Sequence, residues 1–316
     1  MLNDLTILVP FMRYRRVGLA FSAAMMLLAV IAVGVKGLNY ALDFTGGTQV
    51  QMQYQTAPDL EQIRQTLDAA GYPNNEVVTL GSDTNVQIRI QDGAAGENAQ
   101  SESGETAVRV AELLAESSNG TAIFGGSAFI GAQVGDELKE QGGLGMLVAT
   151  ALLMIYIALR FQFKFSVGAV LSVAHDVVFV LGFIALTGLD FDLNVLASIL
   201  AIIGYSLNDT VVVADRIREN FRIMRAATPE EIIDTAVSQT LVRTMITALT
   251  TLLVLFALFF FGGQVLYGFS LVLIVGVLIG TYSSVYVASG VLMFMNLSKE
   301  DMQPAERSKE ELDALP

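Results

Sequence analysis

The chain contains no cysteine and only one histidine among its 316 residues. Without cysteine it can form neither disulfide bonds nor a thiol nucleophile. One histidine among scattered carboxylates lacks the ligand spacing of a metal site, so we expect no bound metal. The Gly-x-x-x-x-Gly-Lys-Ser/Thr pattern of a phosphate-binding loop is also missing, which argues against a nucleotide site. Energy must therefore come from an ion gradient or from a partner protein.

Long apolar runs are the main feature that is present, and 53% of all residues are hydrophobic. A helix of about 20 apolar residues crosses the hydrocarbon core of a bilayer. Six runs approach or exceed this length, at residues 17–35, 143–160, 165–187, 193–214, 241–262 and 265–295. The first is too long for the core of a signal peptide, so we expect it to be retained. The sequence predicts a polytopic α-helical membrane protein with six transmembrane helices.

Basic residues are unevenly distributed between the connecting segments. Lys and Arg cluster before the first run, at 160–164, at 215–240 and after the last run, whereas segment 38–140 has 15 acidic and 4 basic side chains. Lys and Arg concentrate in cytoplasmic loops, so both termini are expected in the cytoplasm and segment 38–140 on the outer side of the membrane, which is the periplasm if the family resemblance described below holds. The predicted order is a cytoplasmic N-terminus (1–16), transmembrane helix 1 (17–35), a periplasmic domain (38–140), a five-helix membrane region (143–297) and a cytoplasmic tail (298–316).

Segment 38–140 carries the alternation and turn signals of a small folded domain. Residues 47–54 alternate in polarity as a half-buried strand does. Thr56 is the expected N-cap, and Pro58 suits the first turn, of a helix that ends at Gly71. Strand-like segments at 76–80, 85–90 and 121–134, a polar linker at 93–104 and a helix at 108–114 complete the segment. This β-α-β-β-α-β order predicts a small α+β domain with a ferredoxin-like arrangement.

The segment 215–240 combines apolar residues with arginines. Ile217 and Phe221 lie among four arginines, and Thr228 and Glu231 form a capping box ahead of further apolar residues. This pattern predicts two amphipathic helices that lie on the cytoplasmic face of the membrane.

Asp209 places a carboxylate inside a run that is long enough to cross the bilayer, flanked by Asn208 and Thr210. An ionisable group in this setting costs several kcal/mol unless it faces protein or water. The next span runs in the opposite direction and begins with Arg243, Thr244 and Thr247 at a similar depth, so Arg243 could approach Asp209. Two interpretations stay open: a static Asp–Arg pair that locks two helices, or a carboxylate that gains and loses protons beside the arginine.

The pair His175-Asp176 lies near the middle of the third span. A neutral histidine bonded to a neighbour on its own helix is one interpretation. The other is a proton relay or a gate, because two polar groups at mid-bilayer must both find partners.

Small residues recur at every fourth position of the last span, at Gly276, Gly280 and Ser284. Such a ridge allows close helix packing. We expect this ridge to receive a six-helix partner, because the bundle is expected to be incomplete alone.

The segment Asp43–Thr48 contains a glycine pair directly after the first span. A phosphate cradle would need a following helix and a lysine, which are missing. The pair therefore predicts a bend where the chain leaves the membrane and enters a strand.

Together these motifs resemble those of the SecF family, whose members are the smaller membrane subunits of the bacterial SecD–SecF protein-export complex in the resistance-nodulation-division superfamily. The segments that carry the resemblance are Asp43–Thr48, Ala174–Asp176, Leu207–Asn220, Arg243-Thr244 and Gly280–Ser284. They occur in family order over nearly the whole chain, and the Leu207–Asn220 stretch is the most specific of them.

The resemblance implies a multi-pass protein of the bacterial inner membrane that needs SecD as its partner. It implies use of the proton-motive force to complete protein translocation, after the ATPase SecA has pushed an unfolded secretory polypeptide through the SecYEG translocon. Asp209 and Arg243 match the residues linked to proton passage. No cofactor besides the proton gradient and no nucleic acid is expected.

Three alternatives remain at this point. A small-molecule or lipid exporter of the same superfamily usually has two six-helix halves and much larger outer domains. A scaffold subunit that conducts no protons would show the same Asp–Arg pair. An intramembrane aspartyl protease using Asp176 and Asp209 would need a Gly-x-Gly-Asp motif, and the sequence here is Ser-Leu-Asn-Asp.

Overall fold

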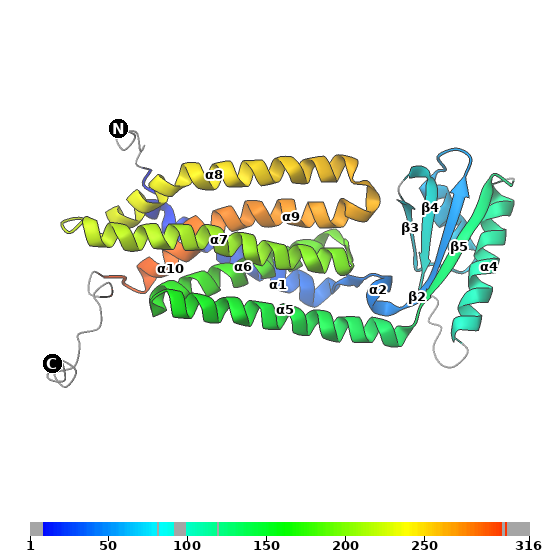
Figure 1. Cartoon of the computed structure of the whole chain (residues 1–316), viewed down its shortest axis with the longest axis horizontal. Coiled ribbons are helices and arrows are strands. Elements are labelled where there is room, and N and C mark those ends of the chain that lie inside the picture. The colour runs from blue at the N-terminus through cyan, green and yellow to red at the C-terminus, as the bar shows by residue number, and fades with distance from the viewer. Residues whose placement is uncertain (1–8, 81, 92–98, 119, 299–300, 302–316) are drawn as a thin grey trace, which may run out of the picture.

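The computed structural model of the chain describes residues 9–80, 82–91, 99–118, 120–298 and 301. Within this part, six helical segments are long and apolar enough to cross a membrane. The bundle is built from α1 (Arg15–Lys36), α5 (Ala132–Arg160), α6 (Phe163–Thr187), α7 (Leu193–Ile223), α8 (Pro229–Phe261) and α9 (Gly263–Ser283), which continues through a π-helical turn η2 (Ser284–Ala288) into α10 (Ser289–Phe294). The helices lie side by side, and a small α+β domain sits at one end of the bundle (Figure 1). The predicted multi-pass membrane protein is confirmed.

Polar side chains fix where the longest helices begin. Asp192 is the N-cap of α7, and its carboxylate accepts a hydrogen bond from the Val195 N–H at 2.7 Å. Thr228 and Glu231 form the predicted capping box of α8, with a proline in its first turn. These caps satisfy backbone N–H groups that have no partner inside the helix.

The α+β domain has the predicted order of elements. It contains β2 (Gly47–Tyr54), α3 (Leu60–Ala69), β3 (Asn75–Leu80), β4 (Ser82–Ile90), α4 (Ala99–Ser117) and β5 (Ala122–Ile130). The antiparallel sheet has the strand order β3-β4-β2-β5, which is the ferredoxin-like order. Fully buried Val50, Leu67, Ile88 and Leu114 form its core between sheet and helices.

Several boundaries of the domain differ from the predicted ones. Asp59, and not Thr56, caps α3 by accepting the N–H of Glu61 at 2.9 Å. Helix α4 starts at Ala99, so the second half of the predicted linker is helical, while residues 93–98 lie outside the described part. The domain ends with β5 and not at residue 140, because the acidic segment after it is the first part of the continuous helix α5.

The segment 215–240 does not form two separate helices on the membrane surface. It is divided between the ends of α7 and α8, which are continuous helices of 31 and 33 residues. Ile217, Phe221, Ile232 and Ile233 are buried in the same core as the membrane helices. An amphipathic pattern indicates that one face of a helix is buried, but not whether lipid or protein covers that face. Here the apolar face packs against the other membrane helices. The tail 298–316 lies almost entirely outside the described residues.

The glycine pair after the first span forms the predicted bend. Gly46 and Gly47 have φ angles of 73° and 141°, which side chains rarely adopt. A Cβ atom on Gly47 would lie 2.3 Å from the carbonyl oxygen of Ile90 on β4. Only glycine therefore fits where the chain enters the sheet.

The small-residue ridge of the last span packs inside the chain and does not receive a partner, so that expectation is wrong. A Cβ atom on Gly276 would lie 2.2 Å from Ile202 of α7, and one on Gly280 would lie 3.4 Å from Cβ of Ser206. Ser284 is fully buried. The ridge lets α9 approach α7 closely, which brings the polar groups of the two helices together.

Alanine substitutions at the two glycines should have unequal effects on stability. Gly276→Ala forces the fully packed Ile202 side chain to move, and overpacking of this kind costs about 1–3 kcal/mol. Gly280→Ala only creates an ordinary van der Waals contact. We expect Gly276→Ala to lower the thermal unfolding midpoint in detergent clearly more than Gly280→Ala. The opposite ranking would contradict the packing described here.

Candidate functional site

Helices α6 and α7 carry two buried carboxylates, Asp176 and Asp209. Helix α7 packs against α6, α8 and α9, so the side chains of Asp209 and its neighbours meet three other helices. Asp176 is 1% exposed and Asp209 is 7% exposed. Both carboxylates therefore lie in the interior of the bundle, where an ionisable group needs polar partners.

Asp209 is held by two hydroxyl groups from neighbouring helices. Thr244 of α8 donates to Oδ1 at 2.5 Å, and Ser284 of the π-helical turn donates to Oδ2 at 2.5 Å. A hydroxyl can donate to an ionised carboxylate or accept from a protonated one. The site can therefore keep both hydrogen bonds when Asp209 gains or loses a proton.

The structure does not bring Arg243 to Asp209. Successive helix residues point about 100° apart, and Thr244, one position further along α8, occupies the place facing the carboxylate. Arg243 is exposed, and the described part of the chain contains no ion pair of its guanidinium. The predicted direct contact is therefore absent from this structure, and a role of Arg243 in proton passage stays a prediction.

The two other predicted site residues near Asp209 do not contact its carboxylate. Asn208 is exposed on α7. The Thr247 hydroxyl donates to its own helix, to the carbonyl oxygens of Arg243 at 3.1 Å and Thr244 at 2.9 Å. Asn208 and Arg243 thus lie on the exposed side of the α7–α8 pair, whereas Thr247 is half-buried and contacts Tyr205 of α7.

Asp176 forms a second buried polar centre. Ser206 of α7 and Ser283 of α9 donate to its Oδ2 at 2.5 and 2.7 Å. Nδ1 of His175 lies 3.0 Å from its Oδ1, as the interpretation of a histidine bonded to a helix neighbour requires. The His175 ring stacks on Phe179, and its buried Nε2 has no hydrogen-bond partner among the residues that the structure describes.

Sequence reasoning did not assign these hydroxyl groups to the carboxylates: it named Thr244, Ser283 and Ser284 only within motifs or as packing residues, and it missed Ser206. Ser172, Ser206, Ser283 and Thr244 are almost fully buried. Serine and threonine within membrane helices commonly bond only to their own helix, so their residue type alone does not single them out. Their recurrence within four of the membrane helices was the available signal.

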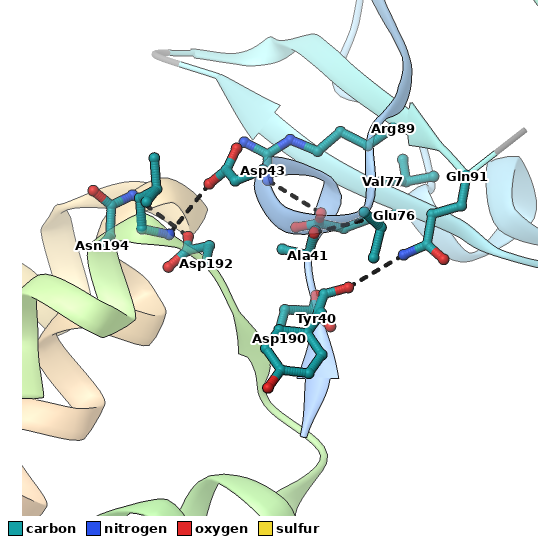
Figure 2. A network of polar contacts seen from close by, with 12 residues as sticks. Tyr40, Ala41, Asp43, Glu76, Val77, Arg89, Gln91, Asp190, Asp192 and Asn194 are labelled. Carbon is teal, nitrogen blue, oxygen red and sulfur yellow. Dashed lines mark hydrogen bonds and ion pairs between the residues drawn. The ribbon is translucent and has the colours of Figure 1, made fainter. Parts of the chain in front are cut away.

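A second polar cluster lies between the α+β domain and the membrane part. A groove of about 640 Å³ separates β3 and β4 from the ends of α6, α7 and α9. Glu76 and Arg89 line its domain side, and Asp190 and Asp192 line its membrane side (Figure 2). The short strand β1 (Asn39–Tyr40) pairs with β6 (Asp190–Phe191), next to the short helix α2 (Leu42–Thr45).

Burial in the groove changes the acidity of its carboxylates. It raises the pKa of Glu76 above 4.5, although Arg89 at 3.2 Å opposes this change. Burial also raises the pKa values of Asp190 and Asp192 above 3.8. The other charged groups that act on these carboxylates are Arg64 on α3 and Asp43 on α2.

The groove should open as the pH rises. A group whose pKa is raised in the closed groove binds its proton more tightly there than in water, so the closed form is favoured at low pH. Closure should then weaken above the ordinary values of 3.8 and 4.5. The cysteine-free chain allows spin labels at Asn74→Cys and Val265→Cys, on opposite sides of the groove. We expect a longer distance at pH 8 than at pH 3.5, below both ordinary values, and a much smaller difference in Glu76→Gln/Asp190→Asn. A pH-independent distance would contradict this prediction.

Comparison with known proteins identifies the family. The model described as "Protein export membrane protein SecD/SecF, C-terminal" matches residues 110–298, and the "SecD/SecF GG Motif" matches residues 31–58, which include Gly46 and Gly47. The protein translocase subunit SecF of Pseudomonas aeruginosa is 43% identical over 98% of both chains. The subunit of Escherichia coli O157:H7 is 38% identical over 96% of this chain and 93% of its own.

A solved structure agrees with these matches. The crystal structure of SecDF, a translocon-associated membrane protein from Thermus thermophilus, aligns with a TM-score of 0.77 and 35% identity. The alignment covers 92% of this chain and 39% of that longer chain. The relatives are named as translocase subunits and not as enzymes. The chain therefore belongs to the SecD/SecF family of protein-export membrane proteins, among the SecF subunits of the Sec export machinery.

Proposed function

We propose that this subunit uses the proton-motive force to drive late-stage translocation of secreted proteins across the bacterial inner membrane. The observation that carries the proposal is Asp209, a buried carboxylate in the membrane bundle whose hydrogen-bond partners are two hydroxyl groups. A fixed cation would hold the carboxylate ionised, whereas hydroxyl groups serve both protonation states. Asp209 is thus suited to take up a proton from one side and release it to the other.

Asp176 is the second candidate proton-holding group, with His175 beside it. Like Asp209, Asp176 accepts hydrogen bonds from two hydroxyl groups, here those of Ser206 and Ser283. Energy then comes from the proton gradient, without a cofactor or a nucleotide site of the subunit's own.

The proposed partners follow from the family. SecD provides the other six-helix half, and the fused SecDF of Thermus thermophilus, which is 38% identical over 86% of this chain, supports such pairing. The SecYEG translocon with the ATPase SecA delivers the unfolded secretory polypeptide. The α+β domain faces the periplasm and both termini face the cytoplasm, because Lys and Arg gather at the opposite end of the bundle.

Inverted membrane vesicles test the proposal. A secretory protein is first moved partway by SecA and ATP, ATP is then removed, and completion is measured with and without an imposed proton gradient. We expect the gradient to speed completion only in vesicles that contain this subunit. If the subunit gives equal completion with and without the gradient, it acts as a scaffold and the proposal is wrong.

A further inference from the structure

Two consecutive serines of the last span each donate a hydrogen bond to one of the two buried carboxylates. Ser283, the final residue of α9, donates to Oδ2 of Asp176 at 2.7 Å. Ser284, the first residue of the π-helical turn η2, donates to Oδ2 of Asp209 at 2.5 Å. Neighbouring residues of one helix therefore bind carboxylates on two different helices, and both serines are fully buried.

Each serine has a second acceptor within reach. The Ser283 hydroxyl lies 3.1 Å from the carbonyl oxygen of Gly280, and the Ser284 hydroxyl lies 3.0 Å from that of Thr281. A hydroxyl has one proton to donate. It can serve the carboxylate or the carbonyl of the preceding turn, and a hydrogen bond to an ionised carboxylate is the stronger of the two.

The π-helical turn makes this segment adjustable. A π turn contains an extra residue relative to an α turn and often marks functional sites within helices. Here it begins at Ser284 and ends at Ala288, and the Ser289 hydroxyl donates to the carbonyl oxygen of Ser284 at 3.3 Å. A small rotation at the start of this turn would move both serine hydroxyls together, because they are on consecutive residues.

We propose that Ser283 and Ser284 are positioning residues that couple the protonation of Asp209 to that of Asp176. When Asp209 takes up a proton, it donates a hydrogen bond to the Ser284 oxygen, and the Ser284 hydroxyl donates to the Thr281 carbonyl instead. The backbone movement shifts Ser283 and changes the hydrogen bond that it gives to Asp176. The other titratable groups at these sites are His175, which contacts Asp176, and Tyr205, which interacts electrostatically with Asp209. This inference rests on the proposed function.

Infrared difference spectroscopy on the full subunit in lipid vesicles tests the coupling. Protonated carboxylic acids have a carbonyl band that ionised ones lack, and Asp176→Asn and Asp209→Asn assign the bands. Of the two carboxylates, Ser284 donates a hydrogen bond to Asp209 and not to Asp176. We nevertheless expect Ser284→Ala to shift the titration midpoint of Asp176 as well. The shift should be up to about one pH unit, which corresponds to one charge-assisted hydrogen bond. Ser283→Ala should shift Asp209 in the same way.

Ser270→Ala is the matched control. Ser270 is a fully buried serine on α9 that donates only to its own helix, to Leu266 at 2.7 Å and Tyr267 at 3.1 Å. It should move neither midpoint. If Ser284→Ala shifts Asp209 alone, or if Asp176 shows no titrating band, the coupling is wrong.

The same variants separate this inference from the proposed function. Loss of the coupling with a normal response of export to the gradient overturns the role of the serines and leaves the proposed function intact. Coupled titrations without any response of export to the gradient overturn the proposed function and leave the coupling intact.

Discussion

Asp209→Asn should abolish the acceleration of export by a proton gradient while the subunit still folds and binds SecD. Asparagine has nearly the same shape as aspartate, and its amide can keep hydrogen bonds to the hydroxyls of Thr244 and Ser284. It cannot take up or release a proton in the physiological range. The variant therefore removes titration from the site with little change in packing.

The vesicle assay with and without an imposed gradient measures this effect. The matched control is Asp234→Asn, because Asp234 is a buried carboxylate of α8 that accepts the backbone N–H of Met12 at 2.8 Å, away from the site. We expect Asp234→Asn to keep the gradient response. If Asp209→Asn also keeps the full response, Asp209 is a static contact that locks helices together.

The position of Asp209 could be predicted from the sequence, but its partners could not. A carboxylate within a long apolar run must face protein or water, and that argument needs no structure. Choosing between Arg243 and Thr244 as its neighbour needs the rotation of α8 about its axis. One residue changes that rotation by about 100°, and α8 exposes residues on so many sides that its pattern does not determine the rotation.

The same reasoning explains which parts of the fold could be predicted. The alternating strand at Gly47–Tyr54 and its neighbours give the order of the domain, and the sheet has the expected arrangement. The sequence assigned residues 132–140 to the α+β domain because this acidic segment does not resemble a membrane span. In the structure it is the first part of α5 and continues directly into the span. Similarly, Ile217 and Ile232 would produce the same pattern on a membrane surface as in the bundle core.

The remaining part of the site depends on contacts between segments that are distant in the sequence. Ser206 and Ser283 are 77 positions apart along the chain and meet on one oxygen of Asp176. Nothing in the local sequence of either serine distinguishes it from one that bonds its own helix. The close approach of α7 and α9 at Gly276 and Gly280 creates this meeting.

Arg243→Lys should give a partial loss of the gradient response, and Arg243→Ala a larger one. Arg243 is 18 residues before the end of α8 at Phe261, about 27 Å along the helix at about 1.5 Å per residue. A hydrocarbon core of about 30 Å then leaves this exposed charge near the inner edge of the bilayer. Two environments fit that depth: a carboxylate of the SecD half, or the lipid headgroups reached by an extended side chain.

The lysine variant separates these two environments. An ammonium group reaches headgroups as well as a guanidinium does, so Arg243→Lys would then behave like the parent. A planar carboxylate partner instead accepts two parallel hydrogen bonds from arginine, which lysine cannot donate. Breaking a buried pair by removing one charge costs about 3–5 kcal/mol, so with Arg243→Ala we expect loss of SecD co-purification as well as of the gradient response.

Arg160→Ala provides the control, because Arg160 is an exposed arginine at the end of α5 that lies over the Phe161 ring. Its loss should change neither SecD binding nor the response to the gradient. If Arg243→Lys matches the parent in both measurements, Arg243 faces lipid headgroups, and the side of α7 and α8 that carries Asn208 and Arg243 is not the surface that binds SecD.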